Sequence, residues 1–404
     1  MGEVEKIKKD KTISQLEKLK SQAGPREANL FYSLCENDQN TIDKAKFKQA
    51  LFDAGLSSLD YRLKSLFEKL EKHGDQINFE EFMIFTRTGG LLAEKALRGE
   101  LAIPDFRDFS RNLDKIYDEV LPNRSGDLAR YIPPLAEVDP EQFGIAVVTT
   151  DGQIYQRGDT NVDFSIQSMC KPFNYSFAIE NLGLEKVNRH VGVEPSGRQF
   201  DDLTLMVKGM GGSSLSPNNK VPFNPMVNAG AIMTTGLINP KDPTNDRLQY
   251  VREQFGRIIG WNEDETSGVD LPRFNKTMAR QENFKGYNNI ATGFLLMATG
   301  NIPYSESLLP DDIHEDSQYE YDFYVEPAVT NALKVYFSIC SLEMTGKDVA
   351  MAAATLANGG VCPITQDRVM SQKTVRNVLP VVQTAGMYNS SGQFFQEIGL
   401  PSKS

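Results

Sequence analysis

Ser168 and Lys171 are two residues whose types and spacing could together carry out covalent catalysis. Three residues apart, they project from the same helix face, where a lysine amine can take the proton of a serine hydroxyl. For this the lysine pKa must fall from about 10.4 to roughly 7–8, which burial or a nearby cation can achieve. Pro172 fits only the first turn of a helix, so the helix is predicted to begin near Ser168. A serine N–H at a helix start could also stabilise an oxyanion, so the stretch predicts acyl transfer.

Taken alone, this spacing is a weak signal. The alternative is a serine that caps a helix beside a solvated surface lysine. The flanking sequence favours catalysis, because an extended stretch leads into Ser168 and an apolar helix face with Phe173 and Phe177 follows. Gly183 is a suitable end for that helix. A serine exposed where a strand meets a helix is a recurrent nucleophile geometry.

Composition argues against several other kinds of function. The 404 residues are 40% hydrophobic and carry a net charge of −11 without a large basic cluster, which argues against nucleic-acid binding. Four cysteines without CxxC spacing suit a reducing compartment, and three histidines without HExxH spacing argue against a zinc site. Cys170 is an alternative nucleophile, but a small buried thiol is the favoured interpretation. No apolar run of about 18 residues predicts a membrane span, and nothing at the N-terminus resembles a transit peptide.

We predict three segments: a flexible lead at 1–24, a helical module at 25–88 that resembles paired EF-hands, and a catalytic domain at 89–404. In the module Thr41 is expected to cap one helix, and Asn78 with Glu81 to form a capping box at another. The calcium signal is poor, because the first loop lacks the central glycine and the second lacks its first two acidic ligands. A structural or docking module is therefore expected.

The predicted catalytic domain combines many helices with few strands. Residues 144–155 predict a β-hairpin with an Asp-Gly turn, leading straight into the Ser168 stretch. Helices are expected at 106–120, 226–237, 349–358 and 374–388. This order of elements predicts an α+β domain.

Several further residues could carry chemistry. Asn228 can bind amides or carboxylates, or simply cap a helix of small residues. Glu282 and Asn289 are seven residues apart, so one continuous helix would place both on the same face; the alternative is a solvated acid and a cap. Three tyrosines could also take part: Tyr131, Tyr336 and Tyr388. Tyrosines in such contexts are more often core aromatics than catalytic groups, and neither role is excluded for these three residues taken one by one.

The order of longer motifs closely resembles the glutaminase family, and within it the animal kidney-type and liver-type enzymes. The resemblance covers about residues 26–404, including the EF-hand-like module. It is carried by Tyr-Ile-Pro (131–133), Gln-Ser-x-x-Lys-Pro (167–172), Glu-Pro-Ser-Gly (194–197), Asn-Pro-Met-Val-Asn-Ala-Gly-Ala (224–231), Ala-Ala-Thr-Leu-Ala-Asn-Gly-Gly (353–360), Gly-Met-Tyr (386–388), Ser-Gly-Gln-Phe (391–394) and Gly-Leu-Pro-Ser-Lys-Ser (399–404).

That resemblance implies an α+β, β-lactamase-like fold and hydrolysis of L-glutamine to L-glutamate and ammonia. It implies Ser168 as the nucleophile, Lys171 as the base and Tyr388 as a proton relay. The substrate-binding positions that it implies are Tyr131, Gln167, Ser168, Asn228, Glu282, Asn289, Tyr336 and Tyr388. The family uses no metal or organic cofactor; phosphate is a possible activator. Its animal members form tetramers and act in mitochondria, with the cytoplasm as the alternative compartment for this chain.

Two departures from the family pattern put parts of this expectation in doubt. The loop at 206–219 is longer and richer in glycine than in the vertebrate enzymes, which affects activation and tetramer contacts. The chain ends at Ser404, where family members continue into strands and a second oxyanion donor, so a C-terminally truncated glutaminase of low activity is expected. The runner-up hypothesis is a non-catalytic glutaminase-like subunit that assembles with full-length chains, and a third is another Ser-Lys amidase of the penicillin-recognising type.

Overall fold

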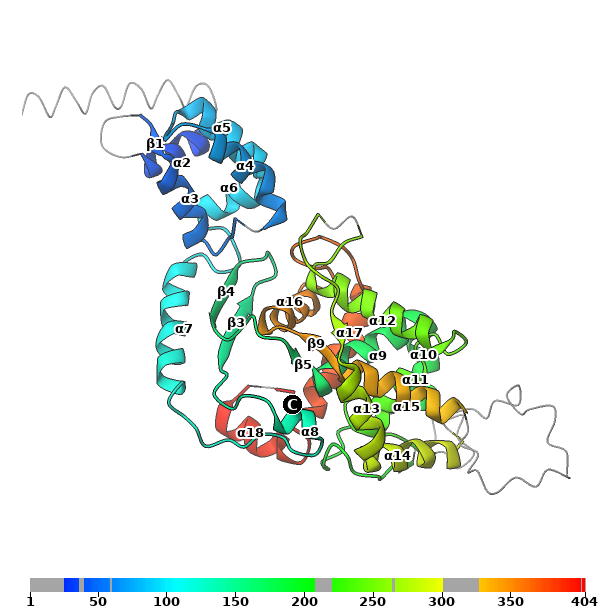
Figure 1. The fold of residues 1–404 in the computed structure, drawn as a ribbon. Coiled ribbons are helices and arrows are strands. Elements are labelled where there is room, and N and C mark those ends of the chain that lie inside the picture. Colours follow the sequence, from blue (N-terminus) through cyan, green and yellow to red (C-terminus); the bar gives the residue numbers. More distant parts are fainter. Residues whose placement is uncertain are drawn as a thin grey trace, which may run out of the picture.

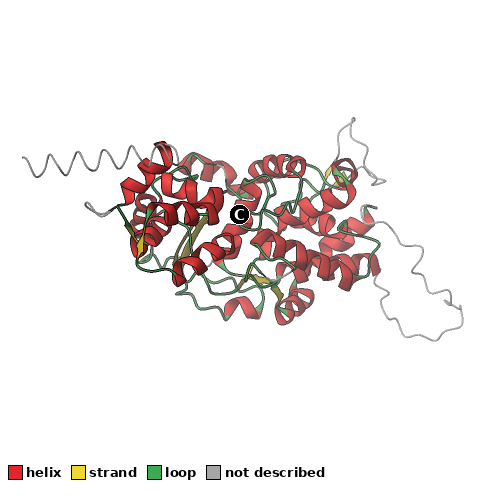
Figure 2. Ribbon diagram, turned by 90° about the horizontal axis from the view of Figure 1, so that it is seen from above, coloured by secondary structure: helices red, strands yellow, loops and turns green. Residues whose placement is uncertain are grey.

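The structure is a computed structural model of the chain and describes residues 25–35, 40–58, 60–207, 220–263, 266–300, 327–400 and 402–403. Helices make up most of the described chain, and the strands are short (Figure 2). A helical module at the N-terminal end stands beside a larger region that contains the predicted site (Figure 1). The lead predicted at 1–24, part of the first calcium loop and most of the glycine-rich loop lie outside the described residues.

The module is a small helical unit with a core of its own. Its two short strands, β1 (Ile42–Asp43) and β2 (Gln76–Ile77), pair antiparallel, with Ile42 opposite Ile77. Its helices are α2 (Pro25–Leu34), α3 (Lys44–Asp53), α4 (Lys64–Lys72), α5 (Phe79–Thr88) and α6 (Gly90–Arg98), with the 3-10 turn η1 (Tyr61–Leu63). Phenylalanines from three helices meet in the core, and Leu101 also belongs to it. The end of the module at residue 88 stays a prediction, and α6 and Leu101, which follow that residue, pack into the same core.

Polar contacts fix the two loops of the module. The predicted capping box of Asn78 and Glu81 is confirmed. The prediction that Thr41 caps a helix is wrong, because Asp43 caps α3 while the Thr41 hydroxyl donates to Gln76 Oε1 of the other loop at 2.7 Å. Lys44 donates to the carbonyl of His73 at 2.9 Å, so an ammonium group occupies part of the second loop. Among the described residues, no group of three or more His, Cys, Asp or Glu side chains could hold a metal ion.

The larger region begins with α7 and a β-hairpin. α7 (Phe106–Val120) coincides with its predicted range and runs along the hairpin, while α16 (Gly346–Ala357) packs against β3 (Figure 1). The predicted hairpin is confirmed: β3 (Gly144–Val148) pairs antiparallel with β4 (Ile154–Gly158). Gly152 in the connecting turn has a φ of 90°, a conformation that favours glycine.

The remaining strands of the described chain form one three-stranded sheet and one two-stranded pair. β5 (Phe164–Ser165) and β8 (Arg273–Phe274) both pair antiparallel with β9 (Leu342–Met344), and β6 (Met206–Val207) pairs with β7 (Lys220–Val221). The other elements are α8 (Pro133–Ala136), η2 (Gln167–Cys170), α9 (Lys171–Leu182), α10 (Leu184–His190), α11 (Asn228–Gly236), α12 (Thr244–Ile259), α13 (Lys276–Lys285), α14 (Tyr287–Ala298), α15 (Pro327–Cys340), α17 (Gln372–Ala385), η4 (Tyr388–Ser390) and α18 (Ser391–Ile398). No helix in the described ranges has the length and apolar character needed to span a bilayer.

Helix α9 lies at the centre of the main hydrophobic core. Every residue from Lys171 to Ile179 is buried, which is the pattern of a helix enclosed on all sides. It contacts α11 and α17, and Phe177 meets Phe255 of α12 edge to face. Lys171, the residue that starts α9, therefore lies against the main hydrophobic core.

Arg62 joins the module to the larger region. Its guanidinium group binds both carboxylate oxygens of Asp60 and donates to the carbonyls of Asp151, in the hairpin turn, and of Pro363. The Asp60 side chain is only 3% exposed, so Arg62 neutralises a buried charge as well as bridging the two parts.

We expect Arg62→Met to destabilise the protein by about 3–5 kcal/mol, because it leaves the buried Asp60 carboxylate without its cation. Urea unfolding followed by circular dichroism measures the change. Arg376→Met, on an exposed stretch of α17, is the control and should change stability by less than about 0.5 kcal/mol. The double variant Asp60→Asn with Arg62→Met should recover part of the loss. Equal unfolding midpoints for the Arg62 variant and the control would contradict this role.

Candidate active site

Ser168 stands in the turn that leads into the buried helix α9. Strand β5 precedes η2, and α9 begins at Lys171 rather than at Ser168, with Pro172 in its first turn as predicted. Ser168 is half-buried and lines a cavity. Cys170 is fully buried and is not among the residues that line that cavity. The geometry favours the serine over the cysteine as the group that a bound molecule can reach.

Two non-glycine residues around this turn have left-handed backbone conformations. Gln167, directly before Ser168, has a φ of 44°, and Tyr388 has a φ of 56°. Such conformations cost on the order of 1–3 kcal/mol and persist only when the surrounding structure imposes them; they cluster at functional sites.

Lys171 is a fully buried amine with two polar contacts. Its Nζ donates to Asn228 Oδ1 at 2.7 Å and lies 3.5 Å from the Tyr388 hydroxyl oxygen. Burial lowers the pKa of Lys171 to about 8. The described residues contain no hydrogen bond between this amine and Ser168 Oγ. The structure nevertheless provides the lowered pKa that a lysine base requires.

Tyr388 connects three elements of the site. Its hydroxyl donates to the Met226 carbonyl at 3.0 Å, and the same oxygen accepts from Lys403 at 2.7 Å. Burial raises the pKa of Tyr388, so the phenol is neutral at physiological pH.

A second polar group lies on the other side of the cavity. The Tyr131 hydroxyl oxygen is 2.7 Å from Glu282 Oε1 and 3.1 Å from Gln167 Oε1. Glu282 is only 2% exposed. Burial raises the pKa of its carboxyl, while the hydrogen bonds from Tyr131 and Gln167 oppose that rise. Among the described residues no lysine or arginine forms an ion pair with Glu282, so its carboxylate is available to a cation in the cavity.

The asparagines come together from two helices. Asn228, in the first turn of α11, donates from Nδ2 to Asn289 Oδ1 of α14 at 2.8 Å. Glu282 and Asn289 do not share one continuous helix, as their spacing suggested: α13 ends at Lys285 and α14 begins at Tyr287. Gly286 permits the break, because a Cβ there would lie 2.6 Å from the Glu282 carbonyl. The turn between α13 and α14, rather than helical periodicity, brings the two residues to the same cavity.

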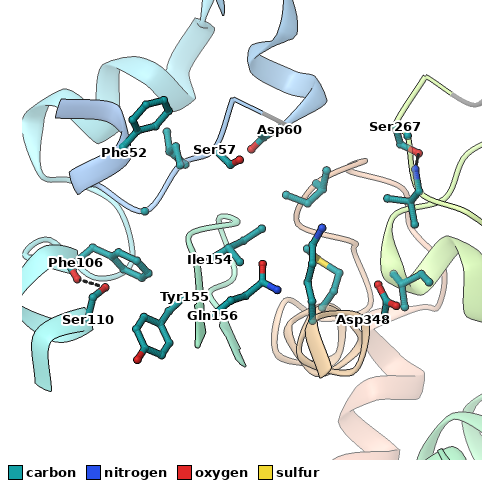
Figure 3. A pocket seen from close by; sticks show the side chains of 18 of the residues that line it. Phe52, Ser57, Asp60, Phe106, Ser110, Ile154, Tyr155, Gln156, Ser267 and Asp348 are labelled. Atoms are coloured by element: carbon teal, nitrogen blue, oxygen red, sulfur yellow. Dashed lines mark hydrogen bonds between the residues drawn. The ribbon is translucent and has the colours of Figure 1, made fainter. Parts of the chain in front are cut away.

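A cavity of about 1040 Å³ unites these residues. The predicted site residues that line it are Tyr131, Gln167, Ser168, Asn228, Glu282, Asn289 and Tyr336. Lys171 and Tyr388 do not line it; Lys171 contacts Asn228, which does, and Tyr388 contacts Lys171. A smaller cavity of about 610 Å³ lies at the junction with the module, between Phe52, Phe106 and Ile154 (Figure 3). It contains none of the predicted site residues, so the larger cavity is the candidate active site.

The arrangement suits hydrolysis of an acyl group attached to an α-amino acid. The Ser168 hydroxyl group belongs to a residue that lines the cavity, and Lys171, three residues later, is a buried amine of lowered pKa. The asparagine amides can bind a carboxylate, and the buried carboxylate of Glu282 can bind an ammonium group.

Lys403 is a site residue that was not predicted as one. Its Nζ contacts the Tyr388 hydroxyl, and burial, followed by the charge of Lys171, lowers its pKa to about 7. The available signal was the motif at 399–404, which contributed to the resemblance without any role for its lysine.

Comparison with known proteins shows the family to which the chain belongs. Residues 126–404, more than half of the chain, match the family model described as Glutaminase. The chain belongs to the glutaminase family. Residues 26–104 match a second model, described as an EF-hand domain, which fits the helical module of this glutaminase-family chain.

Curated relatives and solved structures extend the match. The mouse liver isoform of glutaminase, named as mitochondrial, is 32% identical over 381 residues, which cover 93% of this chain and 56% of the mouse protein. The chain thus spans little more than half the length of that relative. A glutaminase of Microcystis aeruginosa is 36% identical, covering 76% of this chain and 77% of the relative. A crystal structure titled Mglu superimposes with a TM-score of 0.59 at 29% identity, covering 73% of this chain and 64% of the other. The glutaminase fold predicted from the motifs is confirmed.

Proposed function

We propose that this chain is a glutaminase that hydrolyses the side-chain amide of L-glutamine to L-glutamate and ammonia. The observation that carries the proposal is the buried Lys171 amine, which contacts Asn228 and Tyr388 and lies three residues after the half-buried, cavity-lining Ser168. Membership of the glutaminase family supports the substrate. A structural neighbour whose title describes "its glutamate form" supports a pocket for the product's amino-acid part.

In the proposed mechanism neutral Lys171 takes the proton of the Ser168 hydroxyl as Oγ attacks the amide carbon of glutamine. The resulting oxyanion is proposed to accept a hydrogen bond from the backbone N–H of Ser168, in the helical turn that precedes α9. The carbon–nitrogen bond then breaks, and the leaving nitrogen departs as ammonia after receiving a proton from the Lys171–Tyr388 group. Water then attacks the carbonyl carbon of the glutamyl ester and gives a proton to Lys171. Lys171 passes this proton to Ser168 Oγ as the bond between that oxygen and the acyl carbon breaks and glutamate leaves.

Substrate binding is proposed to use the opposite side of the cavity. Glu282 pairs with the α-ammonium group, and Tyr131 and Gln167 hold that carboxylate in place through their hydrogen bonds. Asn228 and Asn289 offer amide donors to the α-carboxylate, and Tyr336 forms part of the cavity wall. An α-amino acid needs both recognition groups, whereas a β-lactam does not, so this arrangement favours glutaminase over another Ser-Lys amidase.

Glu282→Gln should raise the KM for glutamine by roughly 10–100-fold, because a charge-assisted contact to the α-ammonium becomes a neutral one. The kcat should change much less. Steady-state assays of ammonia release measure both constants. Glu119→Gln, on an exposed position of α7, is the matched control and should keep the wild-type KM. An unchanged KM in Glu282→Gln would show that the carboxylate does not meet the substrate cation.

The substrate, the compartment, the oligomeric state and the activator of this chain are proposals as well. Glutaminase relatives support L-glutamine as substrate and a mitochondrial location, and the family resemblance suggests a homotetramer, no required metal or organic cofactor, and phosphate as an activator. Ammonia release from glutamine by the purified chain, with and without phosphate, tests the activity and the activation together. Glutamine binding without ammonia release under either condition would favour the non-catalytic subunit instead.

A further inference from the structure

Lys403 approaches the proposed catalytic group from a different part of the chain than Lys171 does. Its Nζ lies 2.7 Å from the Tyr388 hydroxyl oxygen and 4.4 Å from the centre of the Tyr388 ring. Lys171 contacts the same hydroxyl oxygen at 3.5 Å. Two amines that are 232 residues apart in the chain (171 and 403) therefore contact one phenol.

The hydrogen bonds of Tyr388 define what each amine does there. The single phenolic proton is donated to the Met226 carbonyl, so the oxygen acts only as an acceptor toward both lysines. Lys171 also donates to Asn228 Oδ1 at 2.7 Å, a contact that an –NH₂ or an –NH₃⁺ group can make equally well. These contacts therefore let either lysine carry the extra proton.

We infer that Lys403 is a positioning residue that holds a shared proton at Tyr388 and so keeps Lys171 in the neutral form needed to activate Ser168. This inference rests on the proposed function. Two ammonium groups that contact one oxygen in a buried site repel each other, so a charge on one disfavours a charge on the other.

The titratable groups around Lys171 and Lys403 do not abolish the competition of these two amines for a proton. The other titratable groups that act on the pair are the thiols of Cys170 and Cys340 and the carboxylate of Asp201. Of these only Asp201 is a carboxylate, and it accepts a hydrogen bond from Asn288 at 2.9 Å. Burial lowers the pKa of Lys171 to about 8, and burial with the charge of Lys171 lowers that of Lys403 to about 7. At neutral pH the pair thus binds fewer than two protons, and Lys403 competes with Lys171 for them.

The test replaces the amine by an uncharged side chain of similar length, Lys403→Met. Lysine side-chain nitrogens are followed by NMR as the pH is raised, with Lys171→Met used to assign the signal of Lys171. Removing the neighbouring charge should raise the pH at which Lys171 titrates by about one unit, in line with the usual effect of a like charge. Lys403→Arg keeps a permanent charge and should leave that pH unchanged or lower it. This readout does not require turnover, so it stays informative even if the proposed glutaminase activity is absent.

The pH dependence of kcat/KM in the same variants separates an effect of the Lys403 charge from an effect of its packing. In Lys403→Met the acidic side of the pH profile of kcat/KM should move to higher pH by the same amount, with the KM for glutamine little changed. The effect should largely vanish in a Tyr388→Phe background, since the two lysines meet at that hydroxyl. Lys373→Met, on an exposed position of α17, is the control and should leave the profile unchanged. If Lys171 titrates at the same pH with and without Lys403, or if Lys403→Met and Lys403→Arg shift it equally, the inference is wrong.

Discussion

Ser168→Ala is expected to lower kcat for glutamine hydrolysis by roughly 10⁴–10⁶-fold, the usual loss when a covalent nucleophile is removed. The fold should remain intact, because the side chain is half-buried and forms no hydrogen bond with Lys171 in the described chain. The variant should therefore still bind glutamate, which isothermal titration calorimetry can measure.

Cys170 provides the matched control for this prediction. It lies two residues from Ser168, but its thiol faces the core, where it accepts a weak hydrogen bond from Asn174 at 3.5 Å. Cys170→Ala should retain most of the wild-type kcat. Activity that survives in Ser168→Ala and disappears in Cys170→Ala would transfer the role of nucleophile to the cysteine.

Lys171→Met should lower kcat by about 10²–10⁴-fold, the range expected for the loss of a general base. Glutamate binding should persist, because methionine fills a similar volume and the recognition groups stay in place. Lys373→Met is again the matched surface control and should keep wild-type rates. A Lys171→Met protein that is folded and fully active would show that another group takes the serine proton.

The pH dependence of turnover by the unmodified chain should also reveal the titration of this lysine. The base form is the neutral amine, and its fraction rises as the pH passes upward through the lowered pKa of about 8. The value of kcat/KM should therefore increase by up to tenfold per pH unit below that point and level off above it. A rate that falls as the pH rises from 7 to 8 would contradict a neutral lysine base.

Local sequence signals predicted the parts of the fold that depend on neighbouring residues. The Asp-Gly turn, the capping box at Asn78 and the range of α7 all follow from short-range chemistry and all appear in the structure. Thr41 failed as a cap because its hydroxyl bonds to Gln76, thirty-five residues away. No local pattern contains that partner.

In the candidate site too, local sequence predicted some features, and contacts between distant residues determined the others. Pro172 predicted a helix start close by, and α9 does begin at Lys171, with Pro172 in its first turn. The pairing of Ser168 with Lys171 stays a prediction. Periodicity placed Glu282 and Asn289 on one helix, whereas the chain turns at Gly286 and joins them through two helices. Lys403 could not be assigned from spacing, since only the tertiary fold brings it to Tyr388 and Lys171.

The most direct test of the central claim is to identify the residue that carries the glutamyl group during turnover. The purified chain is mixed with L-glutamine, quenched in acid at a series of times and digested, and the peptides are analysed by mass spectrometry. The proposal predicts a glutamyl ester on Ser168, absent from the Ser168→Ala protein, together with equal amounts of released ammonia and glutamate. Turnover that proceeds with the glutamyl group on another residue, or that continues in Ser168→Ala, would contradict it.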